Sequence, residues 1–451
     1  MLEFYESMKK ICFFLIFMSF GGAFSYSQTG FILQNDKKFD KIRFKLINNL
    51  IVIPVEINGA SLSFILDTGV SKPIVFSFLK ETDSLQINNT EAYFLRGLGE
   101  GKSFEALKSE NNIFRIGNAI KFNQDMYAIH DANLNFTPQL GVPIHGLIGF
   151  DLFKDFVVEI NYAARYIKLH DPLFYKSKQC KSCETINLEF YNNKPYLNAE
   201  VKVNNVTVPV KLLIDSGGSD ALWLFEDDDL GLHANGKYFT DFLGHGLSGS
   251  VYGKRAKINE IHIKSFTLKD VNVSYPDSLA ITVAKQLKER NGSIAGNVLK
   301  RFNTVFNYKK AEVILKKNKF YKEAFSYNKS GIELEYHGDI VVKEEIYTVN
   351  DYANNGSRSD SNTLRVGLTP SYHYVLKPAF VIIELRENSP AAHAGLLVGD
   401  VILNINNKDT HRYTLQEIMH LFYGRENDEI KLIIDRNGIM SKFNFNLKSP
   451  L

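Results

Sequence analysis

Short apolar runs that end at a turn dominate the first two-thirds of the chain. Phe64–Leu66 and Leu212–Ile214 are uninterrupted apolar runs, and an Asp-Thr/Ser-Gly tripeptide follows each of them directly. Runs of this length bounded by turn residues are typical of buried β-strands. Further β-like segments lie at 51–57, 166–169, 196–203 and 312–315. The pattern predicts a protein that is mainly β.

Beyond residue 325 helical spacing appears between strands. Ser389 can cap a short helix that begins at Pro390, and Thr414 with Glu417 forms a possible capping box. The helix that this box would open has an apolar face, formed by Leu415, Ile418, Met419 and Phe422. Strands are expected at 380–385, 429–434 and 441–447. This part of the chain therefore predicts a separate β/α domain.

The candidate chemistry lies in the two tripeptides, Asp67-Thr68-Gly69 and Asp215-Ser216-Gly217, which stand 148 positions apart. After a buried strand, such a tripeptide holds a carboxylate at a tight turn, where a hydroxyl and a glycine backbone can hydrogen-bond to it. Two copies suggest two carboxylates that meet and activate a water molecule. A single copy would carry little weight, because the tripeptide occurs in turns of many kinds.

Other landmarks recur at nearly the same spacing. Gly97 and Gly99 in a glycine-rich hairpin correspond to Gly244 and Gly246 at an offset of 147, and the tetrapeptide 146–149 corresponds to 293–296 at the same offset. Internal repeats of this kind indicate a duplicated unit. The first two-thirds of the chain therefore predicts two equivalent β-rich halves.

This order of strand, Asp-Thr/Ser-Gly, glycine-rich hairpin and apolar-apolar-Gly strand resembles the retropepsin-like and pepsin-like aspartic proteases. The resemblance implies two pseudo-symmetric β-barrel lobes, at 28–179 and 180–324, with Asp67 and Asp215 as the catalytic pair. It further implies supporting roles around the pair for Thr68, Gly69, Ser216 and Gly217, and flaps at Gly97, Gly99, Gly244 and Gly246. No cofactor or second chain would be needed.

The C-terminal part, residues 325–451, resembles a PDZ domain of the kind found in bacterial exported proteases. The resemblance rests on Ser-Pro-Ala-x-x-Ala-Gly-Leu at 389–396 and on Gly399-Asp400. It implies binding of an extended peptide by β-strand addition. We expect an edge strand at 380–385 facing a helix at 415–423, with a carboxylate-binding loop near 377–379 and a mobile insertion at 350–363. The groove candidates are Phe380, Ile382, Leu415, Ile418 and Phe422.

The N-terminus predicts export. Lys9 and Lys10 precede an apolar run from Ile11 to Phe20, which small residues follow. A basic start, an apolar segment of this length and a small-residue exit are typical of a secretory signal peptide, here residues 1–27. No later segment approaches the ~18 apolar residues that a membrane span requires. We therefore expect a periplasmic or extracellular protein without a membrane span.

The two cysteines after the signal peptide, Cys180 and Cys183, form a single C-x-x-C. A zinc site needs four ligands, and a redox site of this type needs a thioredoxin-like context. Because an exported chain meets an oxidising compartment, we favour a local disulfide at the junction of the two halves.

Composition narrows the classes of partner. The 451 residues are 45% hydrophobic and 13% aromatic, as in a globular protein, and the net charge of +3 is too small and dispersed to favour nucleic acid. The spacing of four histidines fits no short-range metal motif, so we expect no metal site from His130, His145, His233 and His245.

Two functions fit these observations. The first is an exported aspartic endopeptidase, acting on peptide or protein substrates, whose PDZ domain recruits or regulates substrate. The second is a protease-like β scaffold that binds peptides without cutting them. Retention of both aspartates, Asp67 and Asp215, together with both following hydroxyls favours the enzyme.

Overall fold

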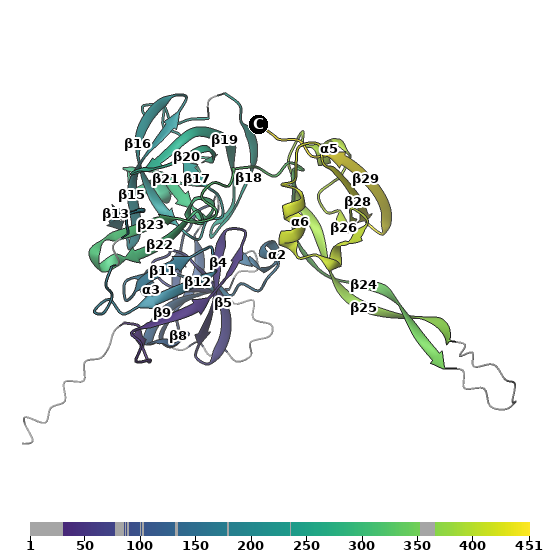
Figure 1. The fold of residues 1–451 in the computed structure, drawn as a ribbon, viewed down its shortest axis with the longest axis horizontal. Coiled ribbons are helices and arrows are strands. Elements are labelled where there is room, and N and C mark those ends of the chain that lie inside the picture. Colours follow the sequence, from purple (N-terminus) through teal and green to yellow (C-terminus); the bar gives the residue numbers. More distant parts are fainter. Residues whose placement is uncertain are drawn as a thin grey trace, which may run out of the picture.

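The computed structural model describes residues 30–451 apart from 77–84, 86, 88–89, 100, 102, 131–133, 178–179, 235 and 352–365. The expected signal peptide at 1–27 and residues 352–363 of the expected insertion lie outside the described residues. Two β-rich lobes pack against each other, and a smaller domain with a long two-stranded arm lies beside them (Figure 1).

Lobe 1 is a β-sheet with two short helices, α2 (Thr137–Leu140) and α3 (Phe150–Phe153). Its strands are β1 (Ile32–Leu33), β3 (Lys45–Ile47), β4 (Leu50–Ile57), β5 (Ala60–Leu66), β6 (Ile74–Phe76), β7 (Thr90–Leu95), β8 (Phe104–Ile116), β9 (Ala119–Ile129) and β10 (Gly146–Ile148). Their order is β1-β9-β6-β10-β5-β4-β8-β7, and β3 pairs with β4. β5 runs between an antiparallel and a parallel neighbour, so its apolar end is buried on both faces.

Lobe 2 repeats this arrangement. Its strands are β14 (Glu189–Tyr191), β15 (Lys194–Val203), β16 (Val206–Asp215), β17 (Leu222–Leu224), β18 (Phe239–Gly246), β19 (Gly249–Ile263), β20 (Phe266–Pro276) and β21 (Arg290–Ala295), followed by α4 (Gly296–Leu299). The order β14-β15-β16-β21-β17-β20 reproduces β3-β4-β5-β10-β6-β9 of lobe 1. Even the parallel pairs correspond, β16 with β21 and β5 with β10. The two lobes are therefore copies of one topology.

A third sheet joins the lobes within one chain. Its strands are β2 (Phe39–Arg43), β11 (Val157–Asn161), β12 (Tyr166–His170), β13 (Cys183–Asn187), β22 (Phe302–Asn307) and β23 (Glu312–Lys317). The order is β13-β23-β22-β11-β12-β2, and Val158 on β11 pairs with Phe306 on β22. As expected, Cys180 and Cys183 form a disulfide where the chain enters lobe 2.

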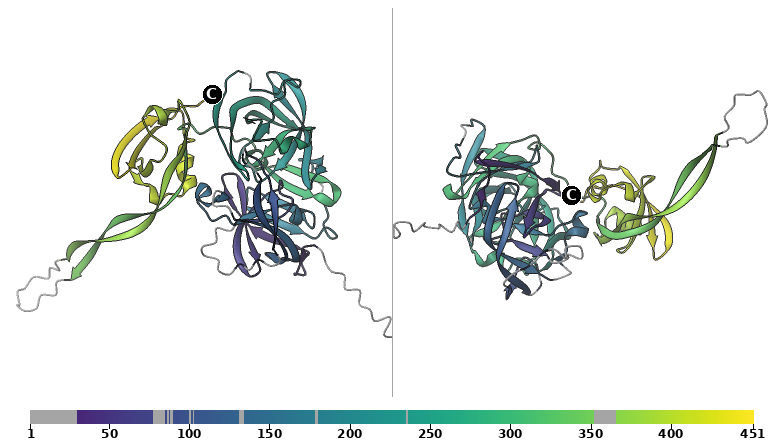
Figure 2. Two further views of the ribbon diagram at one scale, coloured as in Figure 1. Left: turned by 180° about the vertical axis from the view of Figure 1, so that it is seen from behind. Right: turned by 90° about the horizontal axis from the view of Figure 1, so that it is seen from below.

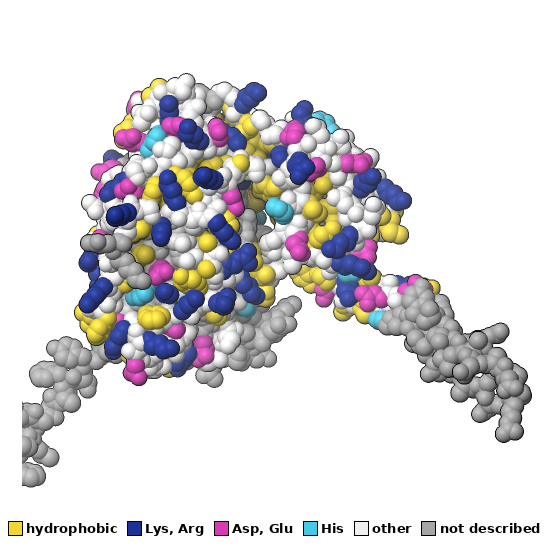
Figure 3. All heavy atoms as spheres, in the orientation of Figure 1, with side chains coloured by type: hydrophobic (Ala, Val, Ile, Leu, Met, Phe, Trp, Pro, Cys, Tyr) yellow, Lys and Arg dark blue, Asp and Glu magenta, His cyan; other side chains and the backbone are white. Residues whose placement is uncertain are grey.

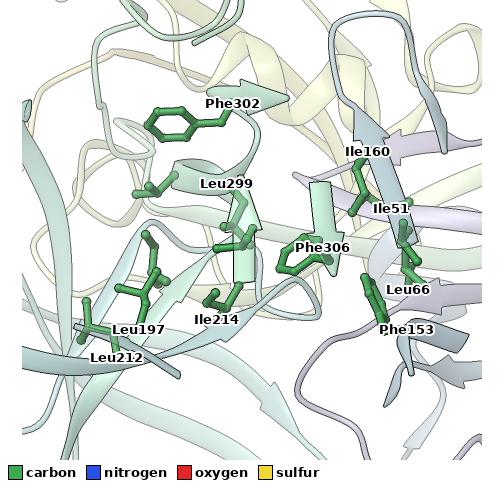
Figure 4. Packing of buried hydrophobic residues seen from close by; sticks show 14 of the residues in the cluster. Ile51, Leu66, Phe153, Ile160, Leu197, Leu212, Ile214, Leu299, Phe302 and Phe306 are labelled. Atoms are coloured by element: carbon green, nitrogen blue, oxygen red, sulfur yellow. The ribbon is translucent and has the colours of Figure 1, made fainter. Parts of the chain in front are cut away.

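One hydrophobic cluster runs through both lobes beneath the tripeptides. Leu66 and Phe153 of lobe 1 are fully buried, and Phe306 of lobe 2 lies beside them (Figure 4). The rings of Phe153 and Phe306 meet edge to face with centroids 5.3 Å apart. Aromatic pairs of this geometry add to the stabilisation from burial alone. The core thus fixes the orientation of the two lobes toward each other.

The C-terminal domain is a sheet with two short helices, α5 (Pro390–His393) and α6 (Leu415–Leu421). Its strands are β24 (Ile332–Asp351), β25 (Val366–Leu385), β26 (Val401–Ile405), β27 (Lys408–Asp409), β28 (Glu429–Arg436) and β29 (Ile439–Asn446), in the order β24-β25-β26-β28-β29 with β27 paired to β26. The predicted caps are confirmed: Ser389 Oγ accepts from Ala392 N–H, and Thr414 and Glu417 form the capping box.

The expected edge strand at 380–385 is wrong. Phe380 pairs with Tyr336 on β24 and with Ile402 on β26, so this segment is an inner strand and β24 lies at the end of the sheet. The expected carboxylate-binding loop at 377–379 is likewise part of β25, paired with β24. The sequence at 380–385 predicts a strand whether it lies at the edge or inside the sheet. Which strands pair with it depends on segments far away in the sequence.

This domain contacts both lobes (Figure 2). Tyr252 of lobe 2 donates a hydrogen bond to Glu384 over 2.6 Å, and Gln416 on α6 donates to the Leu140 carbonyl of lobe 1 over 2.5 Å. The connecting segment packs on lobe 2, where the Tyr327 hydroxyl donates to a backbone carbonyl of β19. The C-terminal domain therefore packs against the body formed by the two lobes.

The molecular surface carries mixed charge. On the face in Figure 3, lysine and arginine side chains are spread among acidic and apolar ones. Within the described ranges, no helix is long and apolar enough to cross a membrane.

Candidate active site

Asp67 and Asp215 stand at equivalent places in the two lobes. Asp67 directly follows β5, and its N–H donates to the Ile148 carbonyl of the parallel strand β10 over 2.8 Å. Asp215 is the last residue of β16 and pairs with Ala295 of the parallel strand β21. Each aspartate therefore leaves a central strand at the point where the two lobes meet.

Thr68 and Ser216 connect the two aspartate loops by four hydrogen bonds. The Thr68 hydroxyl donates to the Ile214 carbonyl over 2.6 Å and accepts from Ser216 N–H over 3.0 Å. The Ser216 hydroxyl donates to the Leu66 carbonyl over 2.7 Å and accepts from Thr68 N–H over 3.0 Å. Both side chains are almost completely buried. Fully satisfied buried networks of this kind are rigid, so they fix the loops relative to each other.

Gly69 and Gly217 let the backbone approach the carboxylates. Gly69 N–H donates to Asp67 Oδ1 over 2.7 Å, and Gly217 N–H donates to Asp215 Oδ1 over 3.1 Å. Across the lobe boundary, a Cβ on Gly217 would lie 2.3 Å from Asp67 Cγ. The carboxyl group of Asp67 therefore rests against the opposite loop, and no larger residue fits at 217.

Burial and the nearby Asp215 charge govern the protonation of Asp67. Burial raises the pKa of Asp67 to about 7, and the adjacent Asp215 carboxylate contributes to this rise. Burial also raises the pKa of Asp215, whereas Arg290 and Lys194 oppose that rise. Two negative charges in one protein-lined site are unfavourable. The site thus favours one ionised and one protonated carboxyl group.

The two glycine-rich hairpins meet tip to tip. Gly97 N–H donates to Ser248 Oγ over 2.9 Å, and Ser248 N–H donates to the Leu98 carbonyl over 2.8 Å. A Cβ on Gly246 would lie 2.2 Å from the Leu98 oxygen, and one on Gly99 would lie 2.6 Å from the Ser248 carbonyl carbon. Three of the four expected flap glycines therefore lie in the contact.

Gly244 lies outside the flap contact. It sits within β18 at a register shift, and a Cβ there would meet no atom within 4 Å. Instead, each tip inserts a leucine into the opposite lobe: Leu98 packs on the cluster of Phe225 and Ile281, and Leu247 packs on the cluster that contains Ile65. The two flaps thus exchange apolar contacts as well as hydrogen bonds.

The pairing of the apolar strand after each hairpin shows that the expected correspondence between 146–149 and 293–296 is wrong by one residue. Ile148 pairs with the residue before the first aspartate, and Ile294 pairs with the residue before the second. The structural offset is therefore 146 rather than 147. Ala295, and not Gly296, takes the place of Gly149 at the start of the short helix that follows. The sequence alignment matched the two glycines, but the segment between the aspartate and this strand is shorter in lobe 2.

The five groove candidates of the C-terminal domain belong to its core: Phe380, Ile382, Leu415, Ile418 and Phe422. The strand that contacts α6 from the end of the sheet is β24. α2 of lobe 1 also contacts β24, and a Cβ on Gly141 would lie 2.9 Å from Leu415 Cβ. Lobe 1 therefore lies against both β24 and α6 (Figure 1).

The turn before β24 already uses its own N–H groups. Asn328 Oδ1 accepts from Ser330 N–H over 3.0 Å and from Gly331 N–H over 3.2 Å, and Ser330 Oγ accepts from Ile332 N–H over 3.0 Å. Capture of a terminal carboxylate relies on free N–H groups at this kind of position. The donors named here are engaged within the turn.

Comparison with known families agrees with this architecture. Residues 199–296 match the family model for an aspartyl protease, and residues 381–436 match the model for a PDZ domain. The first match spans Asp215, the second flap and the bracing strand of lobe 2. The chain thus carries an aspartyl protease domain and a C-terminal PDZ domain, which supports a peptidase with a PDZ domain.

Sequence reasoning missed the residues that surround the aspartates. Lys194 belongs to no motif in the sequence, although it is half-buried and its charge acts on both carboxyl groups. Arg290, which is 7% exposed, and Ser248 also gave no motif. One signal for Lys194 was present in the sequence. The hairpin before each aspartate strand is repeated, and it carries a lysine in lobe 2 where lobe 1 has a leucine. His145 is structural, since its Nδ1 accepts from Ser63 N–H.

Proposed function

We propose that this chain is an exported aspartic endopeptidase in which Asp67 and Asp215 of one chain together activate a water molecule. The observation that carries this proposal is the reciprocal bracing by Thr68 and Ser216, which ties the two aspartate loops into one unit. A scaffold that only holds peptides has no use for two raised-pKa carboxyl groups braced in this way.

The reaction follows from one proton shared by two carboxyl groups. The ionised member takes a proton from water as the water oxygen bonds to the scissile carbonyl carbon. The protonated member gives its proton to the carbonyl oxygen, which forms a gem-diol. When the C–N bond breaks, the protonated member gives its proton to the amine nitrogen, and the ionised member takes a proton from a gem-diol hydroxyl as the new carboxyl group forms. The pair ends with one proton, as it began, so no cofactor is consumed.

The two flaps are proposed to cover the substrate. Their tips hold each other through Gly97, Leu98 and Ser248. Opening this contact admits an extended peptide, and closing it excludes water from the reacting bond. Opening therefore breaks the hydrogen bonds between the tips and withdraws Leu98 and Leu247 from the opposite lobes.

The PDZ domain is proposed to recruit an extended peptide segment by addition to β24. α6 lies beside this strand, and α2 and Gly141 of lobe 1 pack against β24 and α6, so a peptide added there displaces part of this contact. Because the turn at 328–331 uses its own N–H groups, an internal segment fits better than a free C-terminus. Peptide held there remains close to the protease body.

Export is proposed from the N-terminal pattern and is supported by the disulfide. A Cys180–Cys183 disulfide is stable in an oxidising compartment. Expression of the full chain with its first 27 residues, followed by fractionation, tests this part of the proposal. Retention of the uncleaved protein in the cytoplasm would contradict it.

The experiment that tests the activity is cleavage of a mixed peptide library by the mature full chain between about pH 3 and 7. Asp67→Asn and Asp215→Asn serve as matched controls. Cleavage by the wild type with background activity in both variants supports the enzyme. Peptide binding without cleavage in all three proteins supports the scaffold, which is the alternative function.

A further inference from the structure

The PDZ domain contacts lobe 2 at the second flap, the hairpin formed by β18 and the first part of β19 (Figure 1). The Tyr252 hydroxyl on β19 donates to Glu384 Oε1 over 2.6 Å. On β18, Arg386 Nη1 lies 4.0 Å from Asp241 Oδ2, and the Arg386 guanidinium lies 4.8 Å from the centre of the Phe239 ring. Glu384 and Arg386 therefore contact both strands of one flap.

The strand register places these contacts at one level of the hairpin. Asp241 and Tyr252 are neighbours across the two strands, because Tyr252 pairs with the residue that follows Asp241. From this level the hairpin continues to its tip at 247–248, which meets the first flap. The PDZ domain thus contacts the base of the second flap, and the first flap contacts its tip.

Arg386 and Asp241 form a partly buried ion pair that is fixed on both sides. The Arg386 side chain is 6% exposed, and its Nη2 donates to the Asn328 carbonyl over 3.1 Å. The Asp241 side chain is 18% exposed, and its Oδ2 also lies 2.9 Å from Arg255 Nε. Opposite charges with little water around them attract each other more strongly than exposed charges do. Asp241 is therefore held between a cation of the PDZ domain and a cation of its own lobe.

The same series of charges reaches the loop after Asp215. Arg255 Nη1 donates to Asp220 Oδ1 over 3.0 Å, and Asp220 Oδ2 accepts from Trp223 Nε1 over 2.7 Å. Asp220 lies on the loop that joins Asp215 to β17. A continuous series of charged side chains thus connects Arg386 of the PDZ domain to the second flap and to the aspartate loop of lobe 2.

The outer strand of the first flap is exposed instead. This strand, β7, is equivalent to β18, because each lies at the end of its sheet and pairs with the long strand of its hairpin. Phe94 and Tyr93 on β7 are 69% and 49% exposed. Asp241 and Phe242 on β18 are half-buried. The two flaps are therefore alike in topology but differ in their support.

We propose that Glu384 and Arg386 are positioning residues that hold the second flap closed over the two aspartates, so that the position of the PDZ domain controls access to the site. The proposal rests on the proposed function and deepens it, because it assigns the regulation of the flap to a contact between domains. Glu384 and Arg386 act through Tyr252 and Asp241, which lie at the base of the flap. Movement of the PDZ domain away from lobe 2 releases both strands and opens the site.

The first measurement uses Trp223, the single tryptophan of the chain, and needs no substrate. Trp223 packs against the cluster of Leu243 on β18, Val251 on β19 and Ala280, so its exposure to solvent changes when the flap moves. Quenching of its emission by acrylamide is compared in the mature full chain and in Tyr252→Phe, which keeps the ring and removes the hydroxyl that binds Glu384. We expect a larger quenching constant in Tyr252→Phe and also in Arg386→Gln.

Amide hydrogen exchange shows whether the change is confined to the flap. Ser248 N–H donates to the Leu98 carbonyl at the flap contact. Its exchange should quicken about fivefold in Tyr252→Phe, as the loss of one hydrogen bond at an exposed position predicts. The amide of Val273, on the inner strand β20, is the internal reference and should keep its rate. Equal increases at Ser248 and Val273 would show a general loss of stability and contradict the positioning role.

Glu387→Gln is the matched control, since Glu387 is exposed and directly follows Arg386. It is expected to leave both the quenching constant and the exchange of Ser248 at their wild-type values. Where Arg386→Gln does not fold, Tyr252→Phe decides the question, because this position is 38% exposed and keeps its aromatic ring.

The outcomes distinguish this inference from the proposed function. Because neither measurement needs turnover, the inference is decided even if the wild type cleaves no peptide. Unchanged quenching and unchanged exchange of Ser248 in Tyr252→Phe overturn it, and so does an equal change in Glu387→Gln. In an active wild type, Tyr252→Phe should raise KM and leave kcat nearly unchanged, because a loosened flap binds peptide less tightly. A fall in kcat with an unchanged KM would contradict the positioning role.

Discussion

Thr68 and Ser216 each use one hydroxyl to hold the other's loop. Each hydroxyl donates to the carbonyl that precedes the opposite aspartate and accepts the N–H of the opposite hydroxyl residue. Because the hydroxyls lie on different lobes of one chain, this exchange makes the lobe boundary part of the candidate site. It also makes stability and activity depend on the same atoms.

Thr68→Val is therefore expected to reduce both stability and cleavage. The change keeps the size of the side chain but leaves a buried N–H and a buried carbonyl without a partner. Such losses cost about 1 to 3 kcal/mol. Chemical denaturation measures the loss, and kcat/KM on a cleaved peptide should fall at least tenfold.

Thr207→Val is the matched control, since Thr207 lies exposed on β16. It is expected to change stability by less than about 0.5 kcal/mol, as exposed substitutions usually do. Equal effects of the two substitutions would contradict the bracing role.

Ser248→Ala is expected to weaken flap closure without unfolding the protein. The change removes the Oγ that accepts from Gly97 N–H, and a hydrogen bond of this kind contributes about 1 kcal/mol. We expect a roughly fivefold loss of kcat/KM with an unchanged unfolding midpoint. Ser250→Ala removes a hydroxyl that contacts His245 within the same hairpin and should have little effect. If the two variants behave alike, the flap contact does not serve catalysis.

Asp67→Asn is expected to stabilise the protein at neutral pH while it abolishes cleavage. The pKa of Asp67 is raised from 3.8 to about 7, so the folded state binds more protons than the unfolded state between these values. The stability that this group provides is complete below about pH 4 and is lost as the pH rises through about 7. The substitution removes this loss, which these two pKa values put at about 4 kcal/mol at pH 7.

Unfolding curves from pH 4 to 8 measure this slope for the wild type, Asp67→Asn and the exposed control Asp229→Asn. The control should follow the wild type. Parallel curves for all three proteins would show that Asp67 carries no raised pKa.

Glu333→Gln tests the contact between the PDZ domain and lobe 2. Burial, with a smaller contribution from Asp241 of lobe 2, raises the pKa of Glu333 from 4.5 to about 7, against Arg255 and Arg386. The stability contributed by this group is complete below about pH 4 and falls as the pH rises through about 7. Thermal unfolding at pH 5 and pH 8 should therefore differ less in Glu333→Gln than in the wild type.

Glu387→Gln, at an exposed position of the same domain, is the control for this experiment. Its pH dependence should match that of the wild type. A Glu333→Gln protein with the full wild-type slope would show that another group is responsible.

The duplication could be predicted from the sequence because its motifs each lie within a short segment of the chain. The tripeptides, the hairpin glycines, the caps at Ser389 and Thr414 and the cysteine pair each rest on neighbours in sequence. The expected order of strand and hairpin agrees with the topology of both lobes. Whether Asp67 and Asp215 catalyse hydrolysis stays a prediction.

The features of the fold and of the candidate site that the sequence did not predict depend on contacts between distant segments. The strand at 380–385 has the right composition for an edge, and only the pairing with β24 reveals that it is inside the sheet. Lys194 looks like a surface lysine in the sequence, and only the fold brings its charge to act on both carboxyl groups. Gly296 matched Gly149 by letter, although the strand register assigns Ala295 to that place.

The central claim is that both aspartates act within one chain, and a mixing experiment tests it most directly. Asp67→Asn and Asp215→Asn proteins are purified separately, unfolded and refolded together, and compared with wild type at the same total concentration. Our account predicts that the mixture stays at the background of the single variants while the wild type cleaves peptide in proportion to its concentration. Recovery of cleavage on mixing would contradict it, because an intact pair would then have formed between two chains.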